Sequence, residues 1–175
     1  MQLQADLALK SAIDTLTRVV QPALGADETI AAEQLEMVVG LLSVLHKRLP
    51  LLYRFQCEEL ERALGLGDAL AALLDESLSA EERTGLNAAR AKAARELGRA
   101  QTGPNRVQAA TRALRAMTAE LVRTRYAAAS AAERAALRQA VLDYSDDQLL
   151  RDRAWVAAQD WEATELPSVE SLLFE

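Results

Sequence analysis

Few side chains in this sequence could perform covalent catalysis, and the two most reactive are His46 and Cys57. A histidine beside a cysteine can hold the thiol as thiolate, the form that attacks substrates. Cys57, however, falls on a helical stripe with Tyr53, Leu60 and Leu64, where a thiol behaves as a small apolar residue. We therefore expect Cys57 to be a packing element, and we assign no catalytic residue.

The sequence contains no residue pattern typical of a metal site or a phosphate-binding loop. A carboxylate-bridged di-iron bundle needs Glu-x-x-His pairs, but Ser43 stands three residues before the single histidine. With one His and one Cys, a zinc site of the usual composition would need carboxylates for its other ligands. The segment Gly65-Leu66-Gly67 is too short for a phosphate-binding loop and follows no strand. The sequence predicts no metal, no cofactor and a protein that is not an enzyme.

Charged side chains are unevenly distributed along the chain. Residues 1–78, 79–129 and 130–175 carry net charges of -6, +6 and -6. All but one of the middle segment's cations are arginine, dense enough to contact phosphates. The overall charge of -6 weighs against affinity for nucleic acid or an anionic membrane. We expect these arginines to pair with acidic neighbouring helices, and we predict neither nucleic acid nor membrane as a partner.

The elements that would position any site are helices. The chain holds 35 Ala and 30 Leu but only seven aromatic residues, and Ala and Leu favour helix over strand. Few glycines and prolines leave room for long elements and short connections. The sequence predicts an all-α fold, an antiparallel bundle of five to eight helices with short loops. We expect one domain over residues 1–175, with a subdomain boundary near 78 and a C-terminal tail over 164–175.

Apolar periodicity and capping residues predict where the helices begin and end. We expect Asp27 to cap one helix, Gly65 to end another, and Ser79, Ser130 and Ser145 to open three more, each serine followed three residues later by Glu or Gln. The expected helices cover about 5–22, 27–49, 50–65, 68–77, 79–103, 104–129, 130–144 and 145–163.

The helix over 27–49 is apolar on more than one side. Leu42 and Leu45 lie on its main stripe, and Met37, Leu41 and Val44 give it a further apolar side. We expect neighbouring helices to enclose its middle, with Leu42 and Leu45 buried.

A set of large apolar residues lies outside the expected main helix contacts or in the tail. Either further helices cover these side chains, or they are exposed anchors for a partner or ligand. We expect the three tail residues among them to dock on the protein's own surface or on a partner chain. The candidate contacts are Leu51, Phe55, Trp155, Leu172, Leu173 and Phe174.

Several features favour a soluble cytoplasmic protein. A single cysteine cannot form an internal disulfide, and Asp6, Lys10 and Asp14 interrupt what would be the apolar part of a signal peptide. The longest apolar stretch, 37–45, is far shorter than the roughly 20 residues of a membrane-spanning helix.

Residues 7–64 carry a recognisable arrangement: an amphipathic helix running into Val20-Gln21-Pro22-Ala23-Leu24, a short loop and a second helix. This arrangement resembles small helical bacterial proteins encoded beside aminoglycoside-phosphotransferase-like and acyl-CoA dehydrogenase genes. The resemblance covers about a third of the chain and assigns no functional residue. It implies a bacterial protein with a neighbourhood in acyl-thioester or small-molecule catabolism.

Three hypotheses about function follow. The first is a non-enzymatic helical protein that works through protein–protein contacts, including self-association into a homo-oligomer. The second is a bundle that binds an apolar small molecule or acyl group as an accessory to an enzyme. The third, a nucleic-acid-linked regulator, depends on the arginines alone. A ligand binder needs a concave apolar cavity, whereas a contact protein needs an exposed apolar patch.

Overall fold

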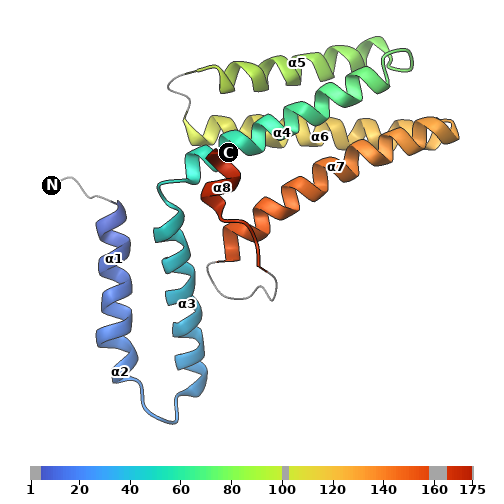
Figure 1. The fold of residues 1–175 in the computed structure, drawn as a ribbon. Helices are drawn as coiled ribbons and strands as arrows, with labels where there is room; N and C mark the ends of the chain where they lie inside the picture. Colours follow the sequence, from blue (N-terminus) through green and yellow to red (C-terminus); the bar gives the residue numbers. More distant parts are fainter. Residues whose placement is uncertain (1–4, 100–102, 158–164, 175) are drawn as a thin grey trace. The chain divides into compact units, whose positions relative to one another are not determined.

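The computed structural model describes residues 5–99, 103–157 and 165–174, and within these ranges every regular element is helical. The all-α prediction is confirmed, and the described helices fit a helical bundle (Figure 1). The elements are α1 (Ala5–Thr15), the π-helical turn η1 (Leu16–Val20), α2 (Gln21–Ala23), α3 (Thr29–Arg48), α4 (Leu52–Leu73), α5 (Ala80–Leu97), α6 (Pro104–Ala128), α7 (Ala131–Val156) and α8 (Val169–Phe174).

The chain divides into two compact units. The first unit comprises Met1–Leu52 and Asp152–Leu172, and the second comprises Tyr53–Arg151 and Leu173–Glu175. Residue 78, where the charge changes, lies inside the second unit between α4 and α5.

The second unit is an antiparallel bundle of α4, α5, α6 and α7, in which successive helices run in opposite directions (Figure 1). Its main core is a cluster of buried apolar residues: Leu60, Leu86 and Leu114 are fully buried, with Val107 and Leu121 beside them. A smaller cluster of Leu70, Leu74 and Leu137 extends it. A core of this kind can stabilise the unit without a partner.

Two glycines allow close packing within this bundle. A Cβ on Gly67 would lie 3.3 Å from Arg90 Cγ, and one on Gly85 would lie 2.9 Å from Met117 Cε. The predicted C-cap at Gly65 is wrong, because α4 continues through Gly65 and Gly67 to Leu73. Gly67 and Gly85 thus allow neighbouring helices to approach closely, and Gly65 lines a groove described below. Neither Gly65 nor Gly67 ends α4.

Local capping signals were accurate at two positions and wrong at two others. The Ser79 and Ser130 capping boxes both form: Glu82 N donates to Ser79 Oγ (3.2 Å) and Glu133 N to Ser130 Oγ (3.3 Å). The predicted break at Ser145 is wrong, since α7 runs through it. Asp27 is also not the cap, because Glu28 precedes α3 and makes no side-chain capping bond.

Several arginines of the middle segment pair with carboxylates, as expected for this segment. Arg115 Nη1 lies 2.8 Å from Glu59 Oε1, and Arg90 Nη2 lies 2.5 Å from Asp68 Oδ1. Arg125 of α6 also bonds to Glu82 of α5. These contacts connect adjacent helices of the bundle, so they favour one helix order over others.

The first unit is built on an antiparallel hairpin, in which α1, η1 and α2 lead down one side and α3 returns beside them (Figure 1). Half-buried Leu9, Ile13 and Leu16 line the inner side of α1 and η1, and buried Leu35 lies on α3. His46 Nε2 of α3 lies 2.9 Å from Asp6 Oδ1, close enough for an ion pair but without hydrogen-bond alignment.

Candidate functional site

The most distinctive surface of the first unit is an exposed apolar face on α3. Its five large apolar side chains are between 46 and 75 % exposed: Ile30, Met37, Val38, Leu41 and Leu45. At 100° per residue these positions fall within a sector of about 100° on one side of the helix, and this sector also holds one exposed polar residue, Gln34. We call this set the α3 face.

The α3 face overturns the prediction that α3 is enclosed. Leu45 is 53 % exposed and Leu42 is only half-buried, so the expected burial of Leu45 is wrong. The half-buried and buried residues Ala32, Leu35, Val39 and Leu42 occupy a different side of the helix. Of the further apolar side predicted from sequence, Val44 is buried, whereas Met37 and Leu41 are exposed. Neighbours therefore cover one apolar side of α3 and leave most of the other in solvent.

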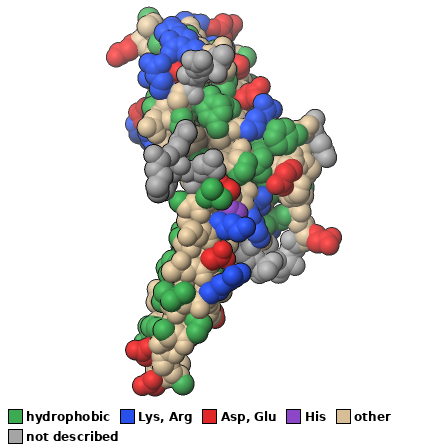
Figure 2. All heavy atoms as spheres, turned by 90° about the vertical axis from the view of Figure 1, so that its left-hand side faces the viewer, with side chains coloured by type: hydrophobic (Ala, Val, Ile, Leu, Met, Phe, Trp, Pro, Cys, Tyr) green, Lys and Arg blue, Asp and Glu red, His purple; other side chains and the backbone are tan. Residues whose placement is uncertain are grey.

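The outward side of α1 differs from the α3 face. It presents Leu7 and Val19 with Lys10, Asp14 and Arg18 between them along one shallow surface. Figure 2, which looks onto this side, shows apolar and charged side chains interspersed there. Single exposed apolar residues of this kind are normal on soluble proteins, so the continuous α3 face is the unusual feature.

α3 is also the one helix among the described residues whose length and composition would let it cross a membrane, with a mean hydropathy of 1.2. Core helices of soluble proteins and signal sequences satisfy the same test, so the finding is weak evidence for a membrane. It does identify α3 as the most continuously apolar long helix in the described part of the chain.

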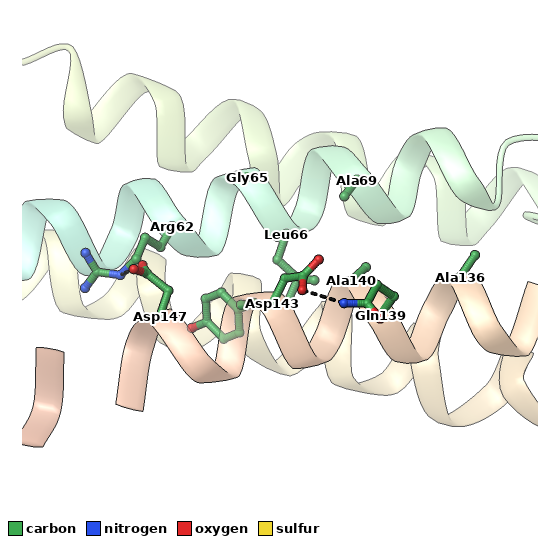
Figure 3. A pocket seen from close by; sticks show the side chains of 10 residues that line it. Arg62, Gly65, Leu66, Ala69, Ala136, Gln139, Ala140, Asp143 and Asp147 are labelled. Atoms are coloured by element: carbon green, nitrogen blue, oxygen red, sulfur yellow. Dashed lines mark hydrogen bonds and ion pairs between the residues drawn. The ribbon is translucent and has the colours of Figure 1, made fainter. Parts of the chain in front are cut away.

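The second unit offers a groove between α4 and α7, with a volume of about 530 Å³ (Figure 3). Small residues create it: Gly65 and Ala69 lie on α4, facing Ala136 and Ala140 of α7. Larger side chains at these positions would fill the space between the two helices. The groove is therefore a consequence of the sequence at these four sites.

Charged groups gather at one end of this groove. Arg62 Nε lies 3.4 Å from Asp147 Oδ2 (Figure 3). The same nitrogen donates to Gln148 Oε1 at 3.2 Å. Burial, and then the nearby charge of Arg151, lower the pKa of Arg62. Arg62 Nη1 is buried without a hydrogen bond, and Glu58 is its ion-pair partner at 3.9 Å. The arginine joins α4 to α7 and is already engaged by neighbouring acidic and polar groups.

A second apolar groove, of about 420 Å³, lies between α6 and α7. It shares Leu66 and Tyr144 with the first groove, so these two side chains separate the grooves. The Tyr144 hydroxyl accepts a 2.6 Å hydrogen bond from Arg115 Nε, and the guanidinium carbon lies 5.8 Å from the ring centroid. Tyr144 is thereby fixed between the grooves.

The two reactive side chains considered from sequence, His46 and Cys57, contact different residues. His46 lies beside Asp6 in the first unit. Cys57 is half-buried in the second unit, packs against the main core and hydrogen-bonds Tyr53, which raises the pKa of the Tyr53 hydroxyl. Among the described residues, no group of three or more His, Cys, Asp or Glu could hold a metal ion.

The six contact residues predicted from sequence are placed in different ways. Trp155 O accepts from Arg48 Nε at 3.1 Å, and the Arg48 guanidinium carbon lies 5.8 Å from the Trp155 ring centroid. Residues 169–174 of the predicted tail form α8, in which Leu173 is buried while Phe174 is 66 % exposed beside Arg54. The half-buried members are Leu51, Phe55, Trp155 and Leu172.

The α3 face was the surface that sequence reasoning missed. Met37 and Leu41 were recognised as part of a further apolar side, but such a side was expected to be covered. The signal in the sequence was that the apolar residues of α3 extend over more than one side of the helix, but this pattern does not tell which side is covered. The chain matches no family model, no curated protein and no solved structure. Its function is therefore inferred from geometry.

Proposed function

We propose that this protein acts through protein–protein contacts, including self-association, and not by catalysis, with the α3 face as its contact surface. The observation that carries the proposal is the exposure of five large apolar side chains on one side of α3. The largest apolar patch on a soluble protein is often a functional surface, because burying it in an interface is favourable.

The test is the mass of the full chain in solution, measured by sedimentation over a wide concentration range. Leu41→Lys places a charge in the middle of the α3 face, so we expect it to abolish association. Leu149→Lys is the matched control, because Leu149 is comparably exposed on α7 of the second unit. Circular dichroism should show that both variants keep the wild-type helix content. Association that survives Leu41→Lys unchanged would contradict the proposal.

The grooves favour a second candidate, binding of an apolar small molecule or acyl group as an accessory to an enzyme. The groove between α4 and α7 supports it, because its lining combines small apolar residues with a few polar groups at one end. Titration with a medium-chain fatty acid, followed by calorimetry, tests it. Ala140→Phe should abolish binding by filling the groove, whereas Ala135→Phe, at an exposed site outside the groove lining, should not. Equal binding by both variants would contradict it.

A further inference from the structure

We propose that the occupant of the α3 face is a second copy of this chain, bound so that the two α3 helices pack antiparallel about a twofold axis beside Met37 and Val38. The inference rests on the proposed function, since it uses the same contact surface, and it adds the identity of the partner and the orientation. The two α1–α3 hairpins would together form an intermolecular four-helix arrangement.

The area of the α3 face suits a pair of copies. The exposed fractions of its five side chains amount to nearly three whole residues, or about 500 Å² of apolar surface. Two copies would bury about 1,000 Å² of such surface together, which reaches the lower bound for a specific interface before any polar flank is counted. A twofold interface needs one self-complementary patch on each chain, and α3 offers one.

The apolar positions support an antiparallel register. When Ile30 of one copy lies level with the partner's Leu45, Met37 lies level with the partner's Val38 at the centre. Each end of the face then meets the opposite end of the other copy. Four of the five side chains then lie level with another member of the face, whereas Leu41 lies level with the partner's Gln34, one turn from the partner's Met37.

The charges at the ends of α3 distinguish the two orientations. Asp27 and Glu28 precede the helix, whereas His46, Lys47 and Arg48 form its last turn. In the register above, the acidic start of each α3 lies level with the basic end of the other, outside the α3 face itself, and the two helix dipoles run antiparallel, which is favourable. A parallel pair would place acidic ends together and basic ends together, with the helix dipoles aligned unfavourably.

The same charges argue against a lipid surface as the occupant. Residues 1–52 carry six acidic and four basic side chains, so the segment that bears the α3 face has net negative charge. Peripheral helices that enter anionic bilayers usually carry Lys and Arg along the polar side. A second copy, by contrast, supplies both the apolar surface and the opposite charges.

Disulfide trapping in full-length protein tests the orientation. The single cysteine is first removed with Cys57→Ser, and Met37→Cys, Ile30→Cys and Leu45→Cys are then added singly. Near the axis, Met37→Cys should cross-link two copies rapidly. Leu45→Cys alone should not, because about 15 residues of helix, roughly 22 Å, separate it from its equivalent in an antiparallel pair. Mixing Ile30→Cys with Leu45→Cys protein should give a mixed dimer.

Each result decides the inference. Rapid cross-linking of Leu45→Cys to itself, with no mixed dimer, would show a parallel pair and overturn the inference while leaving self-association intact. No cross-link at any position, with sedimentation as a monomer at every concentration, would overturn the inference. Co-sedimentation of that monomer with vesicles of anionic phospholipid, lost in Leu41→Lys, would identify a membrane as the occupant and overturn the proposed function as well. Leu149→Cys serves as the control for random collision.

Discussion

The two units of this protein place similar apolar residues in different environments. In the second unit, leucines such as Leu60, Leu86 and Leu114 are fully buried among four helices. In α3 of the first unit, Leu41 and Leu45 are more than half exposed. Apolar periodicity therefore indicates which sides of a helix are apolar. The number of neighbouring helices decides how many of those sides become buried.

The electrostatic contacts differ in the same way. Ion pairs in the bundle join neighbouring helices, as between Arg115 of α6 and Glu59 of α4 or Arg125 of α6 and Glu82 of α5. In the hairpin, the contact between α1 and α3 includes His46 and the exposed Asp6. The bundle is stabilised by contacts within the chain, and the hairpin presents a surface that an additional helix could cover.

The largest expected effect is on the bundle core. Leu114→Ala should lower the free energy of unfolding by about 2 to 5 kcal/mol, because it leaves a cavity at a fully buried site. Urea denaturation of the full chain measures it. A loss below about 0.5 kcal/mol would mean that the four helices do not enclose this side chain.

A smaller effect is expected at the start of α7. Ser130→Ala removes the side-chain acceptor for Glu133 N and should cost about 1 kcal/mol. Ser145→Ala is the matched control in the interior of α7, where we expect a change within about 0.5 kcal/mol. Equal losses in the two variants would indicate that α7 begins elsewhere.

The corresponding change on the α3 face should have little effect in dilute solution. Leu45→Ala is expected to alter the free energy of unfolding by less than about 0.5 kcal/mol when the protein is monomeric, since the side chain is already in water. At concentrations where the protein associates, the same substitution should lower the apparent stability. Loss of stability independent of concentration would place Leu45 in an intramolecular core.

The stability of the bundle should depend on pH in the acid range through Glu82. The hydrogen bond from Ser79, and then Arg125, lower the pKa of Glu82 from 4.5 to about 2. A depressed folded-state pKa adds stability that is present above pH 4.5 and lost as the pH falls towards 2. Glu82→Gln should therefore flatten the decline of unfolding free energy between those values. An unchanged slope would show that this carboxylate does not contribute to acid sensitivity.

The affinity of the protein for nucleic acid is expected to be very low. Several arginines of the middle segment, among them Arg90, Arg115 and Arg125, are paired with carboxylates of the bundle, and the protein is acidic overall. We expect no affinity for duplex DNA or single-stranded RNA tighter than about 10 μM at physiological salt, outside the usual specific range. Fluorescence titrations at low and high salt measure it. Tight binding that falls steeply with salt would favour the regulator hypothesis.

Local signals in the sequence predicted much of the fold. Ala and Leu content predicted helices, and the serines at 79 and 130 predicted two helix starts, because a capping box depends only on neighbouring residues. The helix end predicted at Gly65 and the helix start predicted at Ser145 were wrong, because glycine and serine also occur inside helices where packing or exposure permits them. The exposure of Leu45 was beyond reach, because periodicity does not report how many helices surround α3.

Amide hydrogen exchange at several protein concentrations tests the central claim most directly, because it compares the α3 face with the bundle in one experiment. As concentration rises, exchange in residues 30–45 of α3 should slow markedly, while exchange in α6 should stay constant, since α6 is protected by its own core. Leu41→Lys should remove the concentration dependence in α3 alone. Exchange in α3 that is equally slow at every concentration, in both wild type and Leu41→Lys, would contradict the account.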